Sequence, residues 1–194
     1  MMMKQFLFKL SLTVVAALSV ASASAVYAVE YNQVQVVKSS VTFQYKQMGV
    51  SMDGKFKKFA AQLSFDPEQS AKAKASMDIE LSSIDTGSGE ANDEVSGKAW
   101  FNTKAFPVAR FVAGSVKALG GNRYEIPGKL SIKGQTQDIV VPATFTPQGK
   151  SGVFDGSFTI RRGDFNIGEG AWSKFDIVAN DIVVKFRITA TSGK

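Results

Sequence analysis

Alternation of apolar and polar residues along almost the whole chain is the feature that most constrains its fold. In residues 77–82, Met77 and Ile79 alternate with polar side chains, and residues 182–188 repeat the pattern. A period of two is typical of β-strands that have one buried face and one solvated face. The pattern has one long interruption, at residues 83–111, so we expect an all-β fold with a single helical interlude.

The interruption at residues 83–111 predicts a turn followed by a short helical lid. Residues 86–89 contain the glycines of the turn, and the acidic residues Glu90, Asp93 and Glu94 come next. Carboxylates at the start of a helix offset the positive end of its dipole. The apolar side of the segment and its end are formed by Trp100, Phe101, Phe106 and Pro107, since proline restricts the residue before it.

Outside this segment we count about eight strands, separated by turns rich in glycine and asparagine. Residues 49–54 and 120–122 are expected to be turns, the second with a strong hairpin signal, Gly-Gly-Asn. Antiparallel strands with short turns favour a closed barrel, because closure removes the exposed edges of a flat sheet. The expected strands are residues 34–47, 55–66, 73–84, 108–119, 124–133, 139–147, 151–162 and 176–190.

The N-terminus has the three parts of a secretory signal peptide. Lys4 and Lys9 give a positive start, residues 10–20 are mostly apolar, and small residues follow. Cleavage after Ala25 and after Ala28 both satisfy the small-residue rule, and we favour Ala28 because the first strand then begins close to the new terminus. The apolar run is shorter than the roughly 20 residues that a membrane span needs.

Removal of residues 1–28 leaves residues 29–194, a length that fits one domain with a sizeable core. The formal charge falls from +6 to +4 with the loss of Lys4 and Lys9. We therefore expect a soluble periplasmic protein with a mild basic excess, far from the basic stripe of a nucleic-acid binder. Cysteine is absent from the sequence, so stability must come from packing and sheet hydrogen bonds without disulfides.

The chain also contains no histidine. Without histidine or cysteine there is no ordinary zinc site, axial haem histidine or Ser-His-Asp triad. The carboxylates of residues 85–94 do not have the spacing of a calcium loop, and turn formation and helix-end stabilisation explain them. An ion pair between Asp93 and Arg110 or Arg162 is the expected role of that acid. We predict no enzymatic activity, no cofactor and no metal.

Residues 54–59 interleave lysine and phenylalanine, as a single-stranded nucleic-acid platform can. Strand alternation explains the pattern better, with the lysines facing solvent and Phe56 or Phe59 facing inward. We expect no nucleic-acid partner.

Residues 83–111 resemble a segment of the YceI-like family of secreted, lipocalin-like proteins. That family has a Ser-Ile-Asp-Thr-Gly turn, an acid, an aromatic pair, and a proline followed by a strand ending in phenylalanine, and this sequence matches each part. Residues 40–43, 128–134 and 162–167 agree with further blocks of the family. The resemblance implies a lipocalin-like antiparallel barrel that encloses a long apolar ligand such as a polyisoprenoid. Together with the strand count, the expected fold is a closed eight-stranded barrel.

Two positions depart from the family pattern. Many members carry a histidine where Gln47 stands, and another just after the acid of the interlude, where Glu94 and Val95 stand. Any role that relied on those histidines is not expected in this protein, whereas apolar ligand binding does not depend on them.

The composition alone leaves two interpretations of the barrel interior open. Of the fifteen phenylalanines, only Phe6 and Phe8 lie in the signal segment. The others suit an aromatic core or the wall of a ligand cavity, and the family resemblance favours the cavity. The expected tunnel wall is Phe43, Tyr45, Phe65, Met77, Ile79, Phe111, Leu130, Ile132, Phe158 and Ile160. The expected mouth or lid is Met48, Met52, Trp100, Phe101, Trp172 and Arg162.

Two functions from different classes follow. The first is a periplasmic carrier that holds an isoprenoid lipid, a polyprenol or a quinone, inside the barrel. The alternative is a non-enzymatic interaction protein with a filled barrel that docks on a cytochrome b561-type membrane protein, a partner implied by the family resemblance, as is a homodimer. The volume inside the barrel discriminates between them.

Overall fold

The computed structural model describes residues 29–193. The predicted signal peptide, residues 1–28, lies outside the described residues. The strands are β1 (Tyr31–Val34), β2 (Ser40–Gln47), β3 (Val50–Phe56), β4 (Phe59–Ser64), β5 (Lys74–Glu80), β6 (Ile84–Asp85), β7 (Val108–Ala113), β8 (Lys117–Gly120), β9 (Arg123–Ile132), β10 (Gln135–Gln148), β11 (Ser151–Arg161) and β12 (Asp181–Ser192). The helices are α1 (Gly89–Ser96) and the short 3₁₀ turns η1 (Val36–Lys38), η2 (Pro67–Lys72), η3 (Leu81–Ser83), η4 (Arg162–Phe165) and η5 (Gly170–Trp172).

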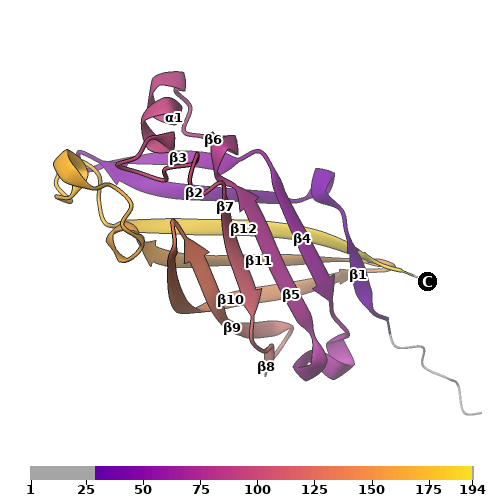
Figure 1. Ribbon diagram of the computed structural model, residues 1–194. Helices are drawn as coiled ribbons and strands as arrows, with labels where there is room; N and C mark the ends of the chain where they lie inside the picture. The colour runs from indigo at the N-terminus through magenta and orange to yellow at the C-terminus, as the bar shows by residue number, and fades with distance from the viewer. Residues whose placement is uncertain (1–28, 194) are drawn as a thin grey trace, which may run out of the picture.

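All strand pairs are antiparallel and belong to one curled sheet (Figure 1). The pairing order is β4-β5-β7-β9-β10-β11-β12-β2-β3-β6, with β1 beside β12 and β8 beside β9. The all-β antiparallel prediction is confirmed. The count of eight strands is wrong, because the sheet has twelve segments. Its path ends at β4 and β6, and an isolated bridge from Tyr31 to Phe65 ties β1 to the end of β4.

The turn predicted at residues 49–54 is instead most of strand β3. The turn contains only Met48 and Gly49, whose φ angles of 49° and 83° are both positive. Such two-residue turns match the right-handed twist of the strands that they join. Strand β3 then pairs with β2 from Gln47↔Val50 to Val41↔Phe56.

The strand predicted at residues 73–84 is broken by η3. Strand β5 pairs with β4 and β7, and after the break β6 pairs with β3. Ser83 stabilises the corner, because its hydroxyl donates to the Glu80 carbonyl at 2.6 Å and accepts from the Lys58 amide at 3.0 Å. The residues expected to form one strand therefore form two, β5 and β6, which pair with different neighbours.

Helix α1 lies where the acidic run predicts it. Ser88 caps its N-terminus by accepting a hydrogen bond from the Ala91 amide at 3.4 Å, and Glu90 lies in the first turn. The helix ends at Gly97, so Trp100 and Phe101 belong to the following turn and not to the helix. None of the helices within residues 29–193 is long and apolar enough to cross a membrane.

Two glycines lie directly opposite phenylalanines in the sheet. Gly54 pairs with Phe43, and Gly156 pairs with Phe186. In each case the phenylalanine ring covers the glycine so closely that a Cβ atom there would collide with it. These rings therefore lie flat along the inner surface of the neighbouring strand.

The core has two parts. The first, which we call the aromatic plug, consists of Tyr31, Phe65, Val116, Tyr124, Phe145, Phe154, Ile188 and Ala190. The second, which we call the mouth cluster, consists of Leu81, Trp100, Ala109, Leu130, Ile132, Phe165, Ile167 and Val178.

Candidate functional site

Two adjoining cavities lie inside the curled sheet. Their volumes are about 190 and 130 Å³. A single water needs only roughly 10–15 Å³ on such a measure, so each cavity has room for a much larger guest. The two cavities share the wall residues Ile79, Ala109, Leu130, Phe158 and Val184.

The larger cavity, which we call the mouth cavity, is lined in part by α1 and by the segment that joins β11 to β12. Alternate residues of β2, β9 and β11 face it, because successive side chains of a strand point to opposite faces. Ala91, Glu94 and Val95 of α1 cover it on one side. Its aromatic lining consists of Phe43, Tyr45, Phe56, Trp100, Phe101, Phe158 and Trp172.

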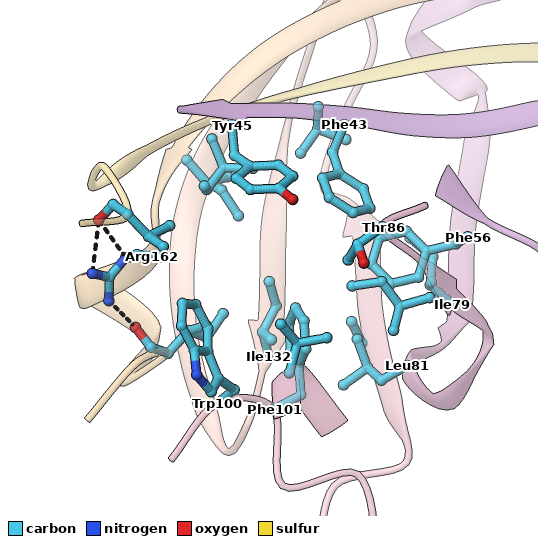
Figure 2. Close-up of a pocket in the computed structure, with 18 of the residues that line it drawn as sticks. Phe43, Tyr45, Phe56, Ile79, Leu81, Thr86, Trp100, Phe101, Ile132 and Arg162 are labelled. Carbon is cyan, nitrogen blue, oxygen red and sulfur yellow. Dashed lines mark hydrogen bonds between the residues drawn. The ribbon is translucent and has the colours of Figure 1, made fainter. Parts of the chain in front are cut away.

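Two hydroxyl groups lie in this mostly apolar wall. The Tyr45 hydroxyl points into the cavity (Figure 2), and no residue of the described chain forms a hydrogen bond with it. Burial raises the pKa of Tyr45, so this group stays a neutral phenol. Thr86 Oγ1 lies 2.9 Å from Asn92 Oδ1, to which it donates, and retains lone pairs that can accept a hydrogen bond.

Arg162 organises one side of the mouth. Its side chain is 1% exposed, and its guanidinium donates to the carbonyls of Ile167 at 2.7 Å, Trp172 at 2.8 Å and Val178 at 2.9 Å. Further donations reach Gly168, Ala179 and Lys174. The guanidinium also lies 5.3 Å from the Trp100 ring centre and 4.8 Å from that of Phe175. Burial lowers the pKa of Arg162.

The same segment is tied to the lid. Trp172 Nε1 donates to Glu94 Oε1 of α1 at 2.8 Å. The backbone amides of Gly168 and Glu169 both donate to the Ala99 carbonyl, at 2.9 and 2.7 Å. Helix α1, the turn that follows it and residues 166–180 therefore form one continuous border of the mouth cavity.

The smaller cavity, which we call the deep cavity, is bounded by the aromatic plug. Phe65, Tyr124 and Phe154 of the plug line it, together with Met77 and Phe111. Burial is the largest cause that raises the pKa of Tyr124. The remaining wall is almost wholly aliphatic, with Gln62 as its amide side chain.

Each residue expected in the tunnel wall lines one of these cavities. Phe43, Tyr45, Ile132 and Ile160 line the mouth cavity alone. Phe65, Met77 and Phe111 line the deep cavity alone, and Ile79, Leu130 and Phe158 line both.

The residues expected at the mouth or lid fall into two groups. Trp100, Phe101, Trp172 and Arg162 line the mouth cavity. Met48 and Met52 line neither cavity. Met48 is 77% exposed at the tip of the short β2–β3 turn, and Met52 lies within the β3 ladder opposite Tyr45.

Several wall residues are not among those expected from the sequence. Strand alternation allows either Phe56 or Phe59 to face inward, and the structure places Phe56 in the mouth cavity. Ile182 and Val184 line the same cavity, and their period-two spacing was the signal that could have identified them. Thr86 lies in the predicted turn, where no strand periodicity points to the interior.

The ion pairs predicted for Asp93 are wrong. Arg110 instead makes a two-point contact with Asp78 at 2.6 Å for each hydrogen bond, because the two residues are opposite each other in β7 and β5. Arg162 is saturated by carbonyl oxygens. Residues 29–193 contain no group of three or more carboxylates that could hold a metal ion.

The fold and the site define a class of protein in which a curled antiparallel sheet encloses apolar cavities beneath a short helix. Residues 32–190 match the YceI-like domain, and the chain therefore belongs to the YceI-like family. The resemblance stated from the sequence is thus confirmed.

Curated relatives and solved structures agree with this assignment. A UPF0312 protein of Pseudomonas savastanoi pv. phaseolicola is 30% identical over 66% of this chain and 70% of its own. The crystal structure of Burkholderia cenocepacia BcnA is similar with a TM-score of 0.80 and 43% identity, over 82% of this chain and all of that one. A polyisoprenoid binding domain from Saccharophagus degradans shares the fold, with a TM-score of 0.66 and 14% identity over 86% of this chain and all of its own.

Proposed function

We propose that this protein is a periplasmic carrier that holds an isoprenoid-type lipid, a polyprenol or a quinone, inside a lipocalin-like barrel. The observation that carries the proposal is the pair of adjoining apolar cavities that share one set of wall residues. Leu130 and Phe158 line both cavities, so a long, chain-like ligand can lie in the mouth cavity and extend past these two residues into the deep cavity.

Apolar burial supplies the affinity in this proposal. Each CH₂ group removed from water contributes about 0.8 kcal/mol, so several isoprene units bind tightly without charged contacts. The structural neighbour from Saccharophagus degradans, described as a polyisoprenoid binding domain, supports the choice of ligand class. The predicted signal peptide supports the periplasmic location.

The test is native mass spectrometry of the mature protein purified from the periplasm without detergent, followed by organic extraction. We expect a discrete added mass that extracts as an isoprenoid. A bare polypeptide that stays bare after incubation with quinones and polyprenols would contradict the carrier function. The same spectra report whether the protein is a homodimer.

A second candidate function, docking on a cytochrome b561-type membrane protein, is favoured by an exposed apolar rim. This rim consists of Met48, Val50, Phe175 and Ile177, which are 77%, 62%, 48% and 41% exposed. The Met48 amide donates to the Ile177 carbonyl at 2.7 Å, so the β2–β3 turn and the loop before β12 form one surface.

Cross-linking to a co-expressed cytochrome b561-type protein tests this function. Met48→Ser and Phe175→Ser are expected to reduce the cross-linked yield, because exposed apolar area drives such contacts. Leu119→Ser in β8, a residue that is 50% exposed, serves as the control. Equal yields for all variants would contradict docking through the rim.

A further inference from the structure

The mouth cavity is unusual in how it distributes charge. Its charged lining residues are Glu94 and Arg162. Arg162 has committed its donors to backbone carbonyls and is 1% exposed. The Glu94 carboxylate, in contrast, lies at the border of the mouth cavity, where it accepts a hydrogen bond from Trp172 Nε1 at 2.8 Å. The cavity therefore presents an anionic guest with a negative charge and no accessible positive one.

Neutral polar groups are available in the same wall. The Tyr45 hydroxyl points into the space and is free to donate (Figure 2). Thr86 Oγ1 donates to Asn92 at 2.9 Å and retains acceptor capacity. These are the partners that an alcohol or a carbonyl oxygen needs, since a buried polar group is stable only when it is hydrogen-bonded.

The polar lining residues of the deep cavity are Gln62 and Tyr124, whereas those of the mouth cavity are Tyr45, Gln47, Thr86 and the charged residues Glu94 and Arg162. The two cavities are thus chemically unequal, and the inequality defines an orientation. An apolar tail belongs in the deep cavity, and the end of the ligand that carries oxygen belongs beside Tyr45.

We propose that the mouth cavity seats an uncharged, oxygen-bearing head group against Tyr45, and that it rejects the phosphorylated form of the same lipid. The shared chemistry of the accepted ligands is a neutral oxygen on an isoprenoid chain, either an alcohol or a quinone carbonyl. This inference rests on the proposed carrier function and adds to it the rule by which cargo is selected.

Charge desolvation gives the size of the discrimination. Bringing a phosphate into an apolar wall without a counter-charge costs several kcal/mol. Because 1.4 kcal/mol corresponds to a factor of ten in affinity, the phosphate is expected to bind roughly 100-fold or more weakly than the alcohol. The single hydrogen bond to Tyr45 is worth about a 2- to 10-fold change.

The experiment compares geranylgeraniol, geranylgeranyl phosphate and the hydrocarbon squalene as ligands of the mature, delipidated protein. The only two tryptophans, Trp100 and Trp172, both line the mouth cavity, so their fluorescence reports binding. We expect binding of squalene and geranylgeraniol, and much weaker binding of the phosphate. A parallel titration with decylubiquinone tells whether the preferred oxygen is a carbonyl or an alcohol. The proposal is supported if either geranylgeraniol or decylubiquinone binds more tightly than geranylgeranyl phosphate.

Tyr45→Phe separates head-group recognition from wall packing. It is expected to weaken geranylgeraniol binding about 2- to 10-fold while leaving squalene unchanged. Tyr31→Phe, a matched change in the aromatic plug at a residue that lines neither cavity, should alter neither ligand. Circular dichroism of both variants verifies that they fold.

Three results would overturn the inference. Equal affinity for the alcohol and the phosphate would refute charge rejection, and an equal loss of squalene and geranylgeraniol in Tyr45→Phe would make Tyr45 a wall residue only. If none of these lipids binds, the carrier function fails and the inference fails with it. That result is distinct from the first two, in which binding persists without selectivity.

Discussion

The two ends of the sheet interior use aromatic residues in opposite ways. In the aromatic plug, the Phe65 ring centre lies 4.9 Å from Phe154 and 5.0 Å from Phe145, and the last two are 4.7 Å apart. Around the mouth cavity the rings are more widely spaced, with Phe43 6.0 Å from Tyr45 and Phe56 6.5 Å from Phe101.

The difference lies in what each ring touches. In the plug, Phe65 meets Phe145 and Phe154 edge to face, which is a favoured geometry of aromatic pairs, and the Phe145 and Phe154 rings are tilted by 38°. At the mouth they line a volume that is bounded on one side by α1 and the Arg162 segment. Aromatic content alone therefore does not distinguish a filled core from a binding cavity.

Arg162→Met should have the largest effect and would show how far the mouth depends on one cation. The change leaves at least the carbonyls of Ile167, Trp172 and Val178 without their donor. Each unsatisfied buried carbonyl costs about 1–3 kcal/mol, so we expect a loss on the order of 5 kcal/mol in urea denaturation. The control is Arg161→Met, since Arg161 is exposed and pairs with Asp164 at 2.8 Å. Equal losses in both variants would contradict the role assigned to Arg162.

Phe65→Ala against Phe101→Ala tests the comparison directly. Phe65 is 2% exposed at the centre of the plug, and its truncation should cost about 3–5 kcal/mol of unfolding free energy. Phe101 is only half-buried and lines the mouth cavity, so its truncation should cost less, roughly 1–2 kcal/mol, and reduce lipid retention more. Thermal denaturation and lipid extraction measure the two effects. The reverse ranking would refute the division into plug and mouth.

Met77→Lys probes the deep cavity between the two ends. Met77 lines this cavity, so a lysine there places a charge among apolar walls. We expect lipid retention to be abolished in a folded protein, measured by native mass spectrometry. Ser76→Lys, whose side chain belongs to the opposite face of β5, should retain its lipid. Unchanged lipid content in Met77→Lys would remove Met77 from the site.

The Asp78–Arg110 pair on the outer face should give the smallest effect. The hydrogen bond from Arg110 is the largest cause that lowers the pKa of Asp78 below its usual 3.8. Its contribution to stability is therefore fully present above that value and is lost as the pH falls through the lowered pKa. Asp78→Asn should slightly flatten the acid side of a urea-midpoint profile without changing lipid retention. A change in retention would show that the outer face influences the cavity.

The sequence supports the prediction of the strand faces because burial on one face leaves a period of two. This is why Phe43, Ile79, Leu130 and Ile160 could be assigned to the interior before the fold was known. The signature of residues 83–111 likewise located α1, whose Ser88 cap and early acids are local features.

Non-local contacts were beyond such reasoning. The glycines of residues 49–54 suggest a turn, yet Gly54 lies in β3, where the Phe43 ring leaves no room for a Cβ atom. Arg162 has several possible partners in sequence, and only the path of residues 166–180 brings their carbonyls around it. The break at Leu81 depends on a hydroxyl of Ser83 that meets Lys58 across the sheet.

The flat rings over Gly54 and Gly156 have a consequence for the calibre of the interior. A phenylalanine side chain that lies along the neighbouring strand extends into the interior only by the thickness of its ring. A side chain that points straight into the interior would extend by its full length. The width of the interior at these two levels therefore depends on both members of each glycine–phenylalanine pair, which lie on different strands. A methyl group at either glycine would push Phe43 toward the mouth cavity, or Phe186 toward the deep one, and narrow the passage without any change in the residues that line it.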